Sequence, residues 1–313
     1  MSQSFNKIVT KNYRNKTAKE ILNAAPDALK GVSADDAKLL KQAFGIDDVR
    51  DFADNKFFSR AQAILAGSGT PTYDAGPPPS WGAFFNRAPL EHYQQFPTDF
   101  RLEFGPVYYR GRLDGTARLI VVGQDPSVNE ILAQRVFVGH SGQRLQGFFR
   151  KLGLSRSYIM VNTYLYSVSG QFMGNLKKLS AEAPILPYRN ECLDRLLDLN
   201  PAVAVLAVGR GAQDAVARWP RSSELEIVEM THPSARDEAA LLANWNNALE
   251  KLRPIIEADD NSVIDDNPFG DTFTDDDYMA IPRFDLPFGL ASWHGVGSHA
   301  RRDGPDKIIW KSP

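Results

Sequence analysis

The chain has 313 residues, of which 43% are hydrophobic and 24% charged, the composition of an ordinary soluble globular protein. It holds no run of about 18 apolar residues and no secretory signal at its start, so neither a membrane span nor export is expected, and the cytoplasm is the expected location. The single cysteine, Cys192, excludes an intramolecular disulfide and a cysteine-ligated metal cluster built from this chain alone.

The net charge of −2 combines segments of opposite sign. Residues 1–19 carry five basic residues and no acidic one, whereas residues 257–277 carry nine acidic residues and no basic one. Outside the acidic stretch the chain is therefore basic, and its net charge neither supports nor forbids binding to nucleic acid.

The first part of the chain reads as helical. Residues 1–68 are predicted to form a helical N-terminal region, in which Ser33 caps one helix and a further helical segment covers 48–66. The basic residues of 1–19 either contact phosphates or lie on the solvated face of a helix. Residues 69–104 are rich in Pro and Gly and then in aromatic residues, which predicts a connection packed on the following domain.

Residues 105–253 alternate short β-rich runs with helical stretches, the pattern of a catalytic domain of α/β class. The predicted strands are 118–122, 158–162, 202–208 and 225–230. The predicted helices are 142–152, 190–199, 211–219 and 236–252. This alternation predicts a three-layer sandwich with a mainly parallel central sheet, in which ligands bind at the carboxyl ends of the strands.

Residues 254–313 are interpreted as an acidic linker and a C-terminal tail. The acidic stretch 257–277 is expected to be solvated, with a phosphate mimic that competes for the DNA site as the alternative. The tail holds Trp293-His294-Gly295 and Arg301-Arg302, which are too patterned for a featureless tail, and the sequence leaves open whether they fold back beside the cleft.

Two loops that follow the first predicted strand carry polar side chains. Gly123 to Ser127 reads GQDPS, in which glycine allows a sharp turn and proline stiffens the exit, so that Asp125 faces the cleft. Taken alone, Asp125 is equally well explained as a turn former. Further on, VFVGHSGQ over 136–143 places two glycines and a serine at a helix start, which suits an anion, and Phe137 is either core or a stacking platform for a base.

Two more loops follow later strands. Asn162 ends the strand YIMVN, and its amide offers both the donor and the acceptor needed to read a pyrimidine edge, although such residues often serve only as turns. His232 begins the sequence HPS after the strand LEIVEM, where it could donate to a substrate carbonyl oxygen. A histidine in isolation is best explained as an ordinary surface residue, and only the four loops together indicate a site.

The ordered set of loops resembles the uracil-DNA glycosylase superfamily over about 115–250. GQDP matches the first motif of one branch and HPS matches its second. The stretch VFVGHSGQRLQGFFRKLGLSRSYIMVNTYLY is similar to the iron–sulfur branch, whose four cluster cysteines are absent here, since the chain has Cys192 alone. The resemblance implies a uracil-DNA glycosylase-like fold without an iron–sulfur cluster.

Roles for individual residues follow from this resemblance. It implies that Asp125 activates the attacking water and stabilises the positive sugar, and that His232 donates to the pyrimidine O2. It implies a base pocket made by Gln124, Ser127, Phe137 and Asn162, with Phe137 stacked under the flipped base. It implies DNA contacts from Ser141, Gln143, Ser234 and Arg236. The four loops contain no lysine, so the product should be an abasic site, and no cofactor or metal is expected.

The base itself is left open by the sequence. The branch with GQDP carries a tyrosine next, which blocks bulk at pyrimidine position 5, whereas this chain has Ser127. The substrate is therefore uracil, in repair, or a bulky 5-modified cytosine of phage DNA, in defence. Two other classes remain: a catalytically silent DNA-binding module of the same fold, and a hydrolase of free nucleotides. A monomer is expected.

Overall fold

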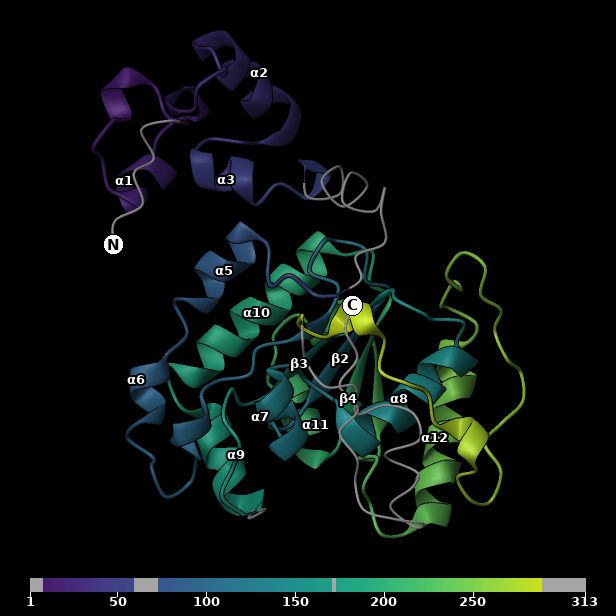
Figure 1. The fold of residues 1–313 in the computed structure, drawn as a ribbon. Helices are drawn as coiled ribbons and strands as arrows, with labels where there is room; N and C mark the ends of the chain where they lie inside the picture. The colour runs from purple at the N-terminus through teal and green to yellow at the C-terminus, as the bar shows by residue number, and fades with distance from the viewer. Residues whose placement is uncertain (1–7, 59–72, 171–172, 289–313) are drawn as a thin grey trace. The chain divides into compact units, whose positions relative to one another are not determined.

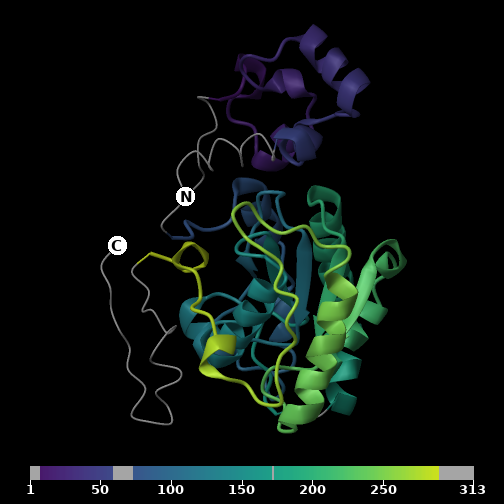
Figure 2. The same cartoon turned by 90° about the vertical axis from the view of Figure 1, so that its right-hand side faces the viewer.

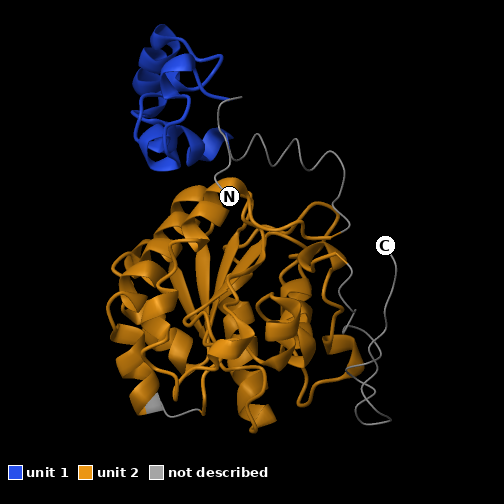
Figure 3. Cartoon of the chain, turned by 60° about the vertical axis from the view of Figure 1, so that its left-hand side comes forward, with its two compact units in different colours: residues 1–65 blue, residues 66–313 orange. Residues whose placement is uncertain are grey.

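The structure, a computed structural model, describes residues 8–58, 73–170 and 173–288. The chain divides into two compact units, residues 1–65 and residues 66–313, coloured separately in Figure 3. The predicted motifs at Trp293 and at Arg301-Arg302 lie outside the described residues. Among the described residues, no helix combines the length and the apolar character needed to cross a membrane.

The first unit is built from short helices around a small apolar core. Its elements are η2 (Lys11–Tyr13), α1 (Ala18–Leu22), η3 (Pro26–Ala28), α2 (Ala34–Phe44) and α3 (Val49–Ala53). Ser33 caps α2 as predicted: its hydroxyl accepts from the Asp36 backbone N–H, and the Asp36 carboxylate accepts in return from Ser33. The helix predicted over 48–66 begins as α3, and residues 59–66 lie outside the described part.

The second unit contains a five-stranded sheet in the order β1-β3-β2-β4-β5 (Figure 1). Its strands are β1 (Arg110–Gly111), β2 (Leu119–Gly123), β3 (Tyr158–Asn162), β4 (Ala204–Val208) and β5 (Glu226–Met230). Only the β1–β3 pair is antiparallel within this sheet. Strands β2, β3 and β4 are buried along their whole length, which explains why they read as continuous apolar runs.

Helices cover both faces of the sheet. The helices of the second unit are α5 (Pro79–Phe85), α6 (Leu90–Tyr93), η4 (Leu102–Phe104), α7 (Val128–Ala133), α8 (Gly139–Lys151), α9 (Met173–Ala181), α10 (Ile185–Leu199), α11 (Arg210–Ala217), η5 (Ser222–Glu224), α12 (Glu238–Leu252), η6 (Asp275–Asp277) and η7 (Arg283–Asp285). Because side chains alternate along a strand, Leu119 and Val121 pack in the core with α8 and α12, and Ile120 and Val122 pack with α10 and α11.

The predicted three-layer α/β sandwich is therefore confirmed. Each of the four predicted strands starts within two residues of an observed one and ends within one, and each of the four predicted helices has an observed counterpart. Strand β1 and helices α7 and α9 were not predicted from the sequence. The helix after Phe137 begins at Gly139, three residues before the predicted start at Gly142.

The interpretation of 257–277 as a solvated linker is wrong. This stretch belongs to a longer C-terminal segment (residues 254–288) that runs over the second unit beside α12 (Figure 2). Phe269 and Phe273 are buried in the core with Trp245. Asp259 is also buried: desolvation favours its neutral form, but hydrogen bonds from residues 155–157 outweigh that effect and hold its pKa below the usual value. The phosphate-mimic alternative stays a prediction.

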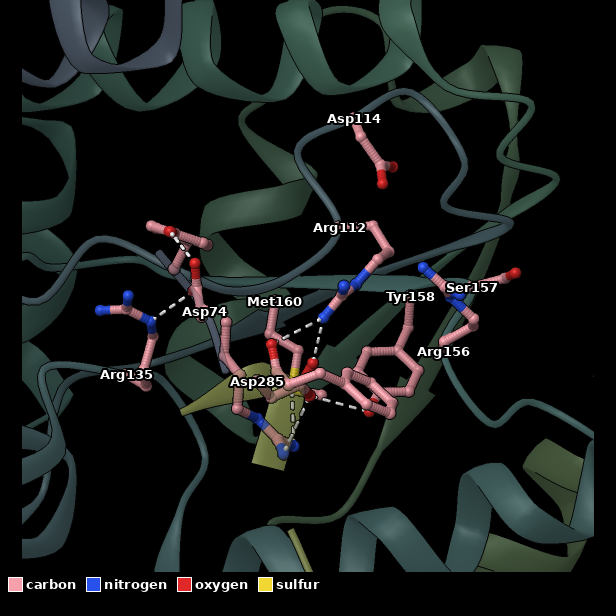
Figure 4. Close-up of polar contacts among 12 residues, drawn as sticks. Asp74, Arg112, Asp114, Arg135, Arg156, Ser157, Tyr158, Met160 and Asp285 are labelled. Atoms are coloured by element: carbon pink, nitrogen blue, oxygen red, sulfur yellow. Dashed lines mark hydrogen bonds and ion pairs between the residues drawn. The ribbon is translucent and has the colours of Figure 1, made fainter. Parts of the chain in front are cut away.

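A buried ion cluster fixes the end of the C-terminal segment (Figure 4). The Asp285 carboxylate is fully buried, ion-paired with Arg112, and 3.5 Å from Nη1 of Arg110. The Tyr158 hydroxyl on β3 donates to the same carboxylate at 2.8 Å. A buried carboxylate needs opposite charge and hydrogen-bond donors, and here residues of β1 and β3, together with Arg112 directly after β1, supply both. The segment is thus an integral part of the second unit.

Candidate functional site

A cleft of about 550 Å³ opens where the parallel strands end. Strands β2, β4 and β5 lead directly into loops that line it, as expected for the carboxyl edge of such a sheet. Seven of the predicted site residues line this cleft: Gln124, Asp125, Ser127, Phe137, Ser141, His232 and Ser234. The volume lies within the usual range of small-molecule binding pockets.

The Asp125 carboxylate is held in place from two sides. Its Oδ2 accepts from the backbone N–H of Val168 at 3.0 Å, and its Oδ1 accepts from Nε2 of Gln124 at 3.0 Å. The chain after β3 runs alongside this loop, since Tyr164 N–H donates to the Gln124 carbonyl at 2.9 Å. These bonds satisfy the carboxylate and fix its direction at the half-buried end of β2.

Gly123 brings Asn162 and Phe137 close together. A Cβ atom added at Gly123 would lie 2.3 Å from Oδ1 of Asn162 and 2.8 Å from the ring of Phe137. Glycine is therefore required for both side chains to approach this strand end. Asn162 is buried and borders a separate void of about 20 Å³ rather than the main cleft. Its Nδ2 has no hydrogen-bond partner among the described residues.

Glu130 supports Phe137 and was missed by the sequence analysis. Phe137 has a φ of 51°, a left-handed conformation that costs free energy for a bulky residue. Its backbone N–H donates to one carboxyl oxygen of Glu130, and the backbone N–H of Ser127 donates to the other. The spacing Ser-x-x-Glu, a capping box at the start of α7, was the signal that could have identified it.

Replacing Glu130 by glutamine should destabilise the fold. Glutamine keeps one acceptor but turns an NH₂ group toward one of the two N–H donors, those of the buried Phe137 and of Ser127, a loss of about 1–3 kcal/mol in the free energy of unfolding. Urea denaturation measures this loss, with the exposed Glu226→Gln as the matched control. An unfolding free energy equal to that of the control would contradict this role of Glu130.

The effect of Glu130→Gln on the free energy of unfolding should also depend on pH. Burial, with a smaller effect of nearby Asp125, raises the pKa of Glu130 from 4.5 to about 7, against the lowering effect of the hydrogen bonds from Ser127 and Phe137. Since the folded pKa exceeds the unfolded one, the stability that this group contributes is full below about pH 4.5 and is lost as pH rises through about 7. The stability gap between wild type and Glu130→Gln should therefore narrow from pH 5 to pH 8.

His232 reaches the cleft from the end of β5. The centroid of the His232 ring lies 6.3 Å from the centroid of the Phe137 ring. A Cβ atom added at Gly209 would lie 3.4 Å from the Cβ of His232, and the φ of 84° at Gly209 also favours glycine. The Ser234 backbone N–H points at Nδ1 of His232 at 3.2 Å, and the Ser234 hydroxyl lies 2.8 Å from the same atom. An accepting Nδ1 leaves the proton of the neutral ring on Nε2.

Burial also sets the charge of His232. Desolvation lowers the pKa of its imidazole below the ordinary 6.5, so the neutral ring is the form present at neutral pH. A neutral ring with its proton on Nε2 is a hydrogen-bond donor that brings no positive charge into the site. The cleft thus holds a fixed carboxylate and a neutral imidazole donor.

The remaining predicted DNA contacts differ in placement. Ser141 and Ser234 line the cleft, whereas Arg236 is exposed and does not line it. Gln143 was predicted to contact DNA, but its side chain is 1% exposed inside α8, so that prediction is wrong for this conformation. Two exposed arginines that line the cleft, Arg101 and Arg210, were not predicted. None of the described residues lining the cleft is a lysine.

Comparison with known protein families finds a match in the second unit. The family model described as Uracil DNA glycosylase superfamily matches residues 111–253, from the second residue of β1 to the residue after α12. No curated protein matches the chain. The matched residues include every loop that forms the carboxyl edge of the sheet, whereas the C-terminal segment lies outside them.

Proposed function

Since residues 111–253 belong to the uracil DNA glycosylase superfamily, we propose that the chain is a monofunctional DNA glycosylase. It hydrolyses the N-glycosidic bond of a flipped pyrimidine and leaves an abasic site. The observation that carries the proposal is the shared cleft, in which Asp125 from the end of β2 and neutral His232 from the end of β5 both face the space a base would occupy.

The chemistry needs charge stabilisation at two points. When the bond between base and sugar breaks, its electron pair goes to the base, and the sugar becomes cation-like. Asp125 stabilises that sugar and takes the proton of the water whose oxygen bonds to C1′. His232 donates its Nε2–H to the pyrimidine O2, where negative charge builds. A fixed carboxylate and a fixed donor suit these roles because neither must reorganise during the reaction.

The base must leave the duplex before it can react, which costs a few kcal/mol and requires a pocket that repays it. Phe137 supplies a ring for stacking, held by the Glu130 carboxyl group. Asn162 supplies an amide next to that ring for the base edge. Four residues that line the cleft are proposed to contact phosphates: Arg101, Arg210, Ser141 and Ser234. The exposed Arg236 is proposed to enter the space that the flipped base leaves in the stack.

The absence of lysine from the described lining of the cleft bears on the product. Strand cleavage by a glycosylase requires an amine that forms a Schiff base with the sugar. With water as the nucleophile, the reaction ends at the abasic site, and the strand breaks only after treatment with alkali. Incubation with a uracil-containing oligonucleotide, with and without alkali, tests both points. Release of no base from any candidate oligonucleotide favours the silent DNA-binding module.

The substrate is proposed to be uracil or a bulky 5-modified cytosine of the kind found in phage DNA. Ser127 is exposed and lines the cleft where a tyrosine would narrow it. A serine leaves room for a substituent at pyrimidine position 5. Base release from uracil DNA and from DNA with glucosylated hydroxymethylcytosine separates repair from defence, since release from uracil DNA alone rules out the defence role.

Replacing Ser127 by tyrosine should narrow the pocket. Release of a bulky 5-modified base should fall by about 10- to 200-fold, the usual range for steric discrimination, while release of uracil changes little. Ser127→Ala is the matched control, because it removes the capping hydroxyl of α7 without adding bulk. An equal loss for both bases in the tyrosine variant would show general damage to the site and contradict the role of Ser127.

A further inference from the structure

Arg144 on α8 connects the His232 loop to a part of the chain outside the matched family domain. Its Nη1 donates to the carbonyl of Pro233 at 2.6 Å, the residue between His232 and Ser234. Its Nε donates to the Tyr278 hydroxyl at 2.9 Å. The guanidinium carbon also lies 4.0 Å from the ring centroid of Phe273, a cation–π contact. One planar group therefore bonds the loop and the C-terminal segment together.

The C-terminal segment is seated closely on α8 at this point. A Cβ at Gly147 would lie 1.9 Å from the carbonyl oxygen of Asp277, so glycine is needed for the two backbones to approach. The Met279 backbone N–H donates to the Gln143 carbonyl at 3.1 Å. Tyr278 and Phe273 are thus held in fixed positions, and they fix Arg144 in turn.

We propose that Arg144 is a positioning residue for His232, and that Tyr278 and Phe273 orient it. The inference rests on the proposed function, because it assigns His232 the role of donor to the base. His232 is held on one side by Ser234 at Nδ1, and the Arg144 bond fixes the backbone at the next residue. Two anchors on one short loop define the direction of Nε2, and small misplacements of a catalytic donor cost large factors in rate.

Three variants test the proposal. Arg144→Gln removes the charged fork, and Tyr278→Phe removes one of its partners while keeping the ring. Arg150→Gln is the matched control: Arg150 also lies on α8 and donates to the C-terminal segment, at the Asp276 carbonyl, but does not touch the His232 loop. A purely structural role for Arg144 predicts equal effects of Arg144→Gln and the control.

The measurements are single-turnover base release and DNA binding by the full chain. Arg144→Gln should lower the release rate by about 10- to 100-fold with DNA affinity within about threefold of wild type, because positioning affects the transition state rather than binding. Tyr278→Phe should give a smaller loss, and the double variant should be no slower than Arg144→Gln alone, since both act through one group. Release rates equal to those of Arg150→Gln would overturn the proposal.

A second readout separates this inference from the proposed function. The NMR signals of the His232 ring should shift in Arg144→Gln and Tyr278→Phe but not in Arg150→Gln, whether or not the chain releases a base. An inactive wild type with shifted ring signals would reject the proposed function alone, whereas unshifted signals would reject the positioning role. If Arg144→Gln does not fold, Tyr278→Phe against Arg150→Gln decides the question by the same readouts.

Discussion

Replacing Asp125 by asparagine should lower the single-turnover rate of base release by about 10²- to 10⁴-fold, the range for loss of an acid–base group. The amide is isosteric and keeps an oxygen that can accept from Val168 N–H, so the fold should persist. DNA binding should persist as well, because phosphate contacts are proposed to come from other residues. Release rates measured by alkaline cleavage, with binding measured separately, give both quantities.

The outcome for Asp125→Asn also distinguishes the classes of function. An enzyme loses base release and keeps binding, whereas a silent binding module shows no release in the wild type and no change in the variant. Base release that survives the substitution within about threefold would contradict the proposed role of the carboxylate, since such a change is under 1 kcal/mol in activation free energy.

Replacing His232 by glutamine should lower the release rate by about 10²- to 10³-fold, as for loss of one donor to a developing oxyanion. Glutamine removes the imidazole whose orientation Ser234 fixes through Nδ1. His92→Gln is the matched control, because His92 does not line the cleft. A glutamine variant with the rate of the control would exclude His232 from the reaction.

The pH profile follows from the lowered pKa of His232. Protonation at Nδ1 would set an N–H against the Ser234 N–H that points at this atom, and burial opposes the charge as well. The release rate of the wild type should therefore hold through pH 6.5 and fall only at lower pH. Because the folded pKa is lower than the unfolded one, the stability linked to this histidine is full above pH 6.5 and is lost as pH falls through the folded pKa.

The sheet and its cleft were predictable because they depend on local pattern and topology. Continuous apolar runs marked β2 and β3, and parallel strands place their carboxyl ends on one edge. The sequence pattern therefore predicted that Asp125 and His232 lie at the same edge of the sheet, although they are far apart along the chain. By contrast, β1 has only two residues, includes the buried Arg110 and lacks any apolar pattern, so its pairing with β3 could not be predicted from the sequence.

Errors in the site arose from local geometry that the sequence did not fix. Ser141 and Gln143 were both assigned to the DNA face by the family resemblance, which says nothing about the direction of each side chain on the helix. In the observed helix they are two residues apart, about 200° around the axis, so when Ser141 faces the cleft Gln143 must face elsewhere. Glu130 was missed because its bond to Phe137 depends on how the chain turns between them.

The acidic stretch 257–277 was wrongly interpreted as a solvated linker for a different reason. Its composition is that of a solvated segment, but composition averages over positions, and a few apolar anchors such as Phe269 and Phe273 decide whether a segment packs. Asp259 and Asp265 are likewise bound to partners on the domain rather than to water alone.

The buried Asp285 cluster has a consequence for where the second unit can be divided. The family match ends at residue 253. A chain truncated there would lack Asp285, and the buried guanidinium groups of Arg110 and Arg112 would lose the carboxylate that balances their charge. The end of the family match at residue 253 is therefore not the end of the folded unit, and the smallest fragment of the second unit that folds on its own must reach past Asp285.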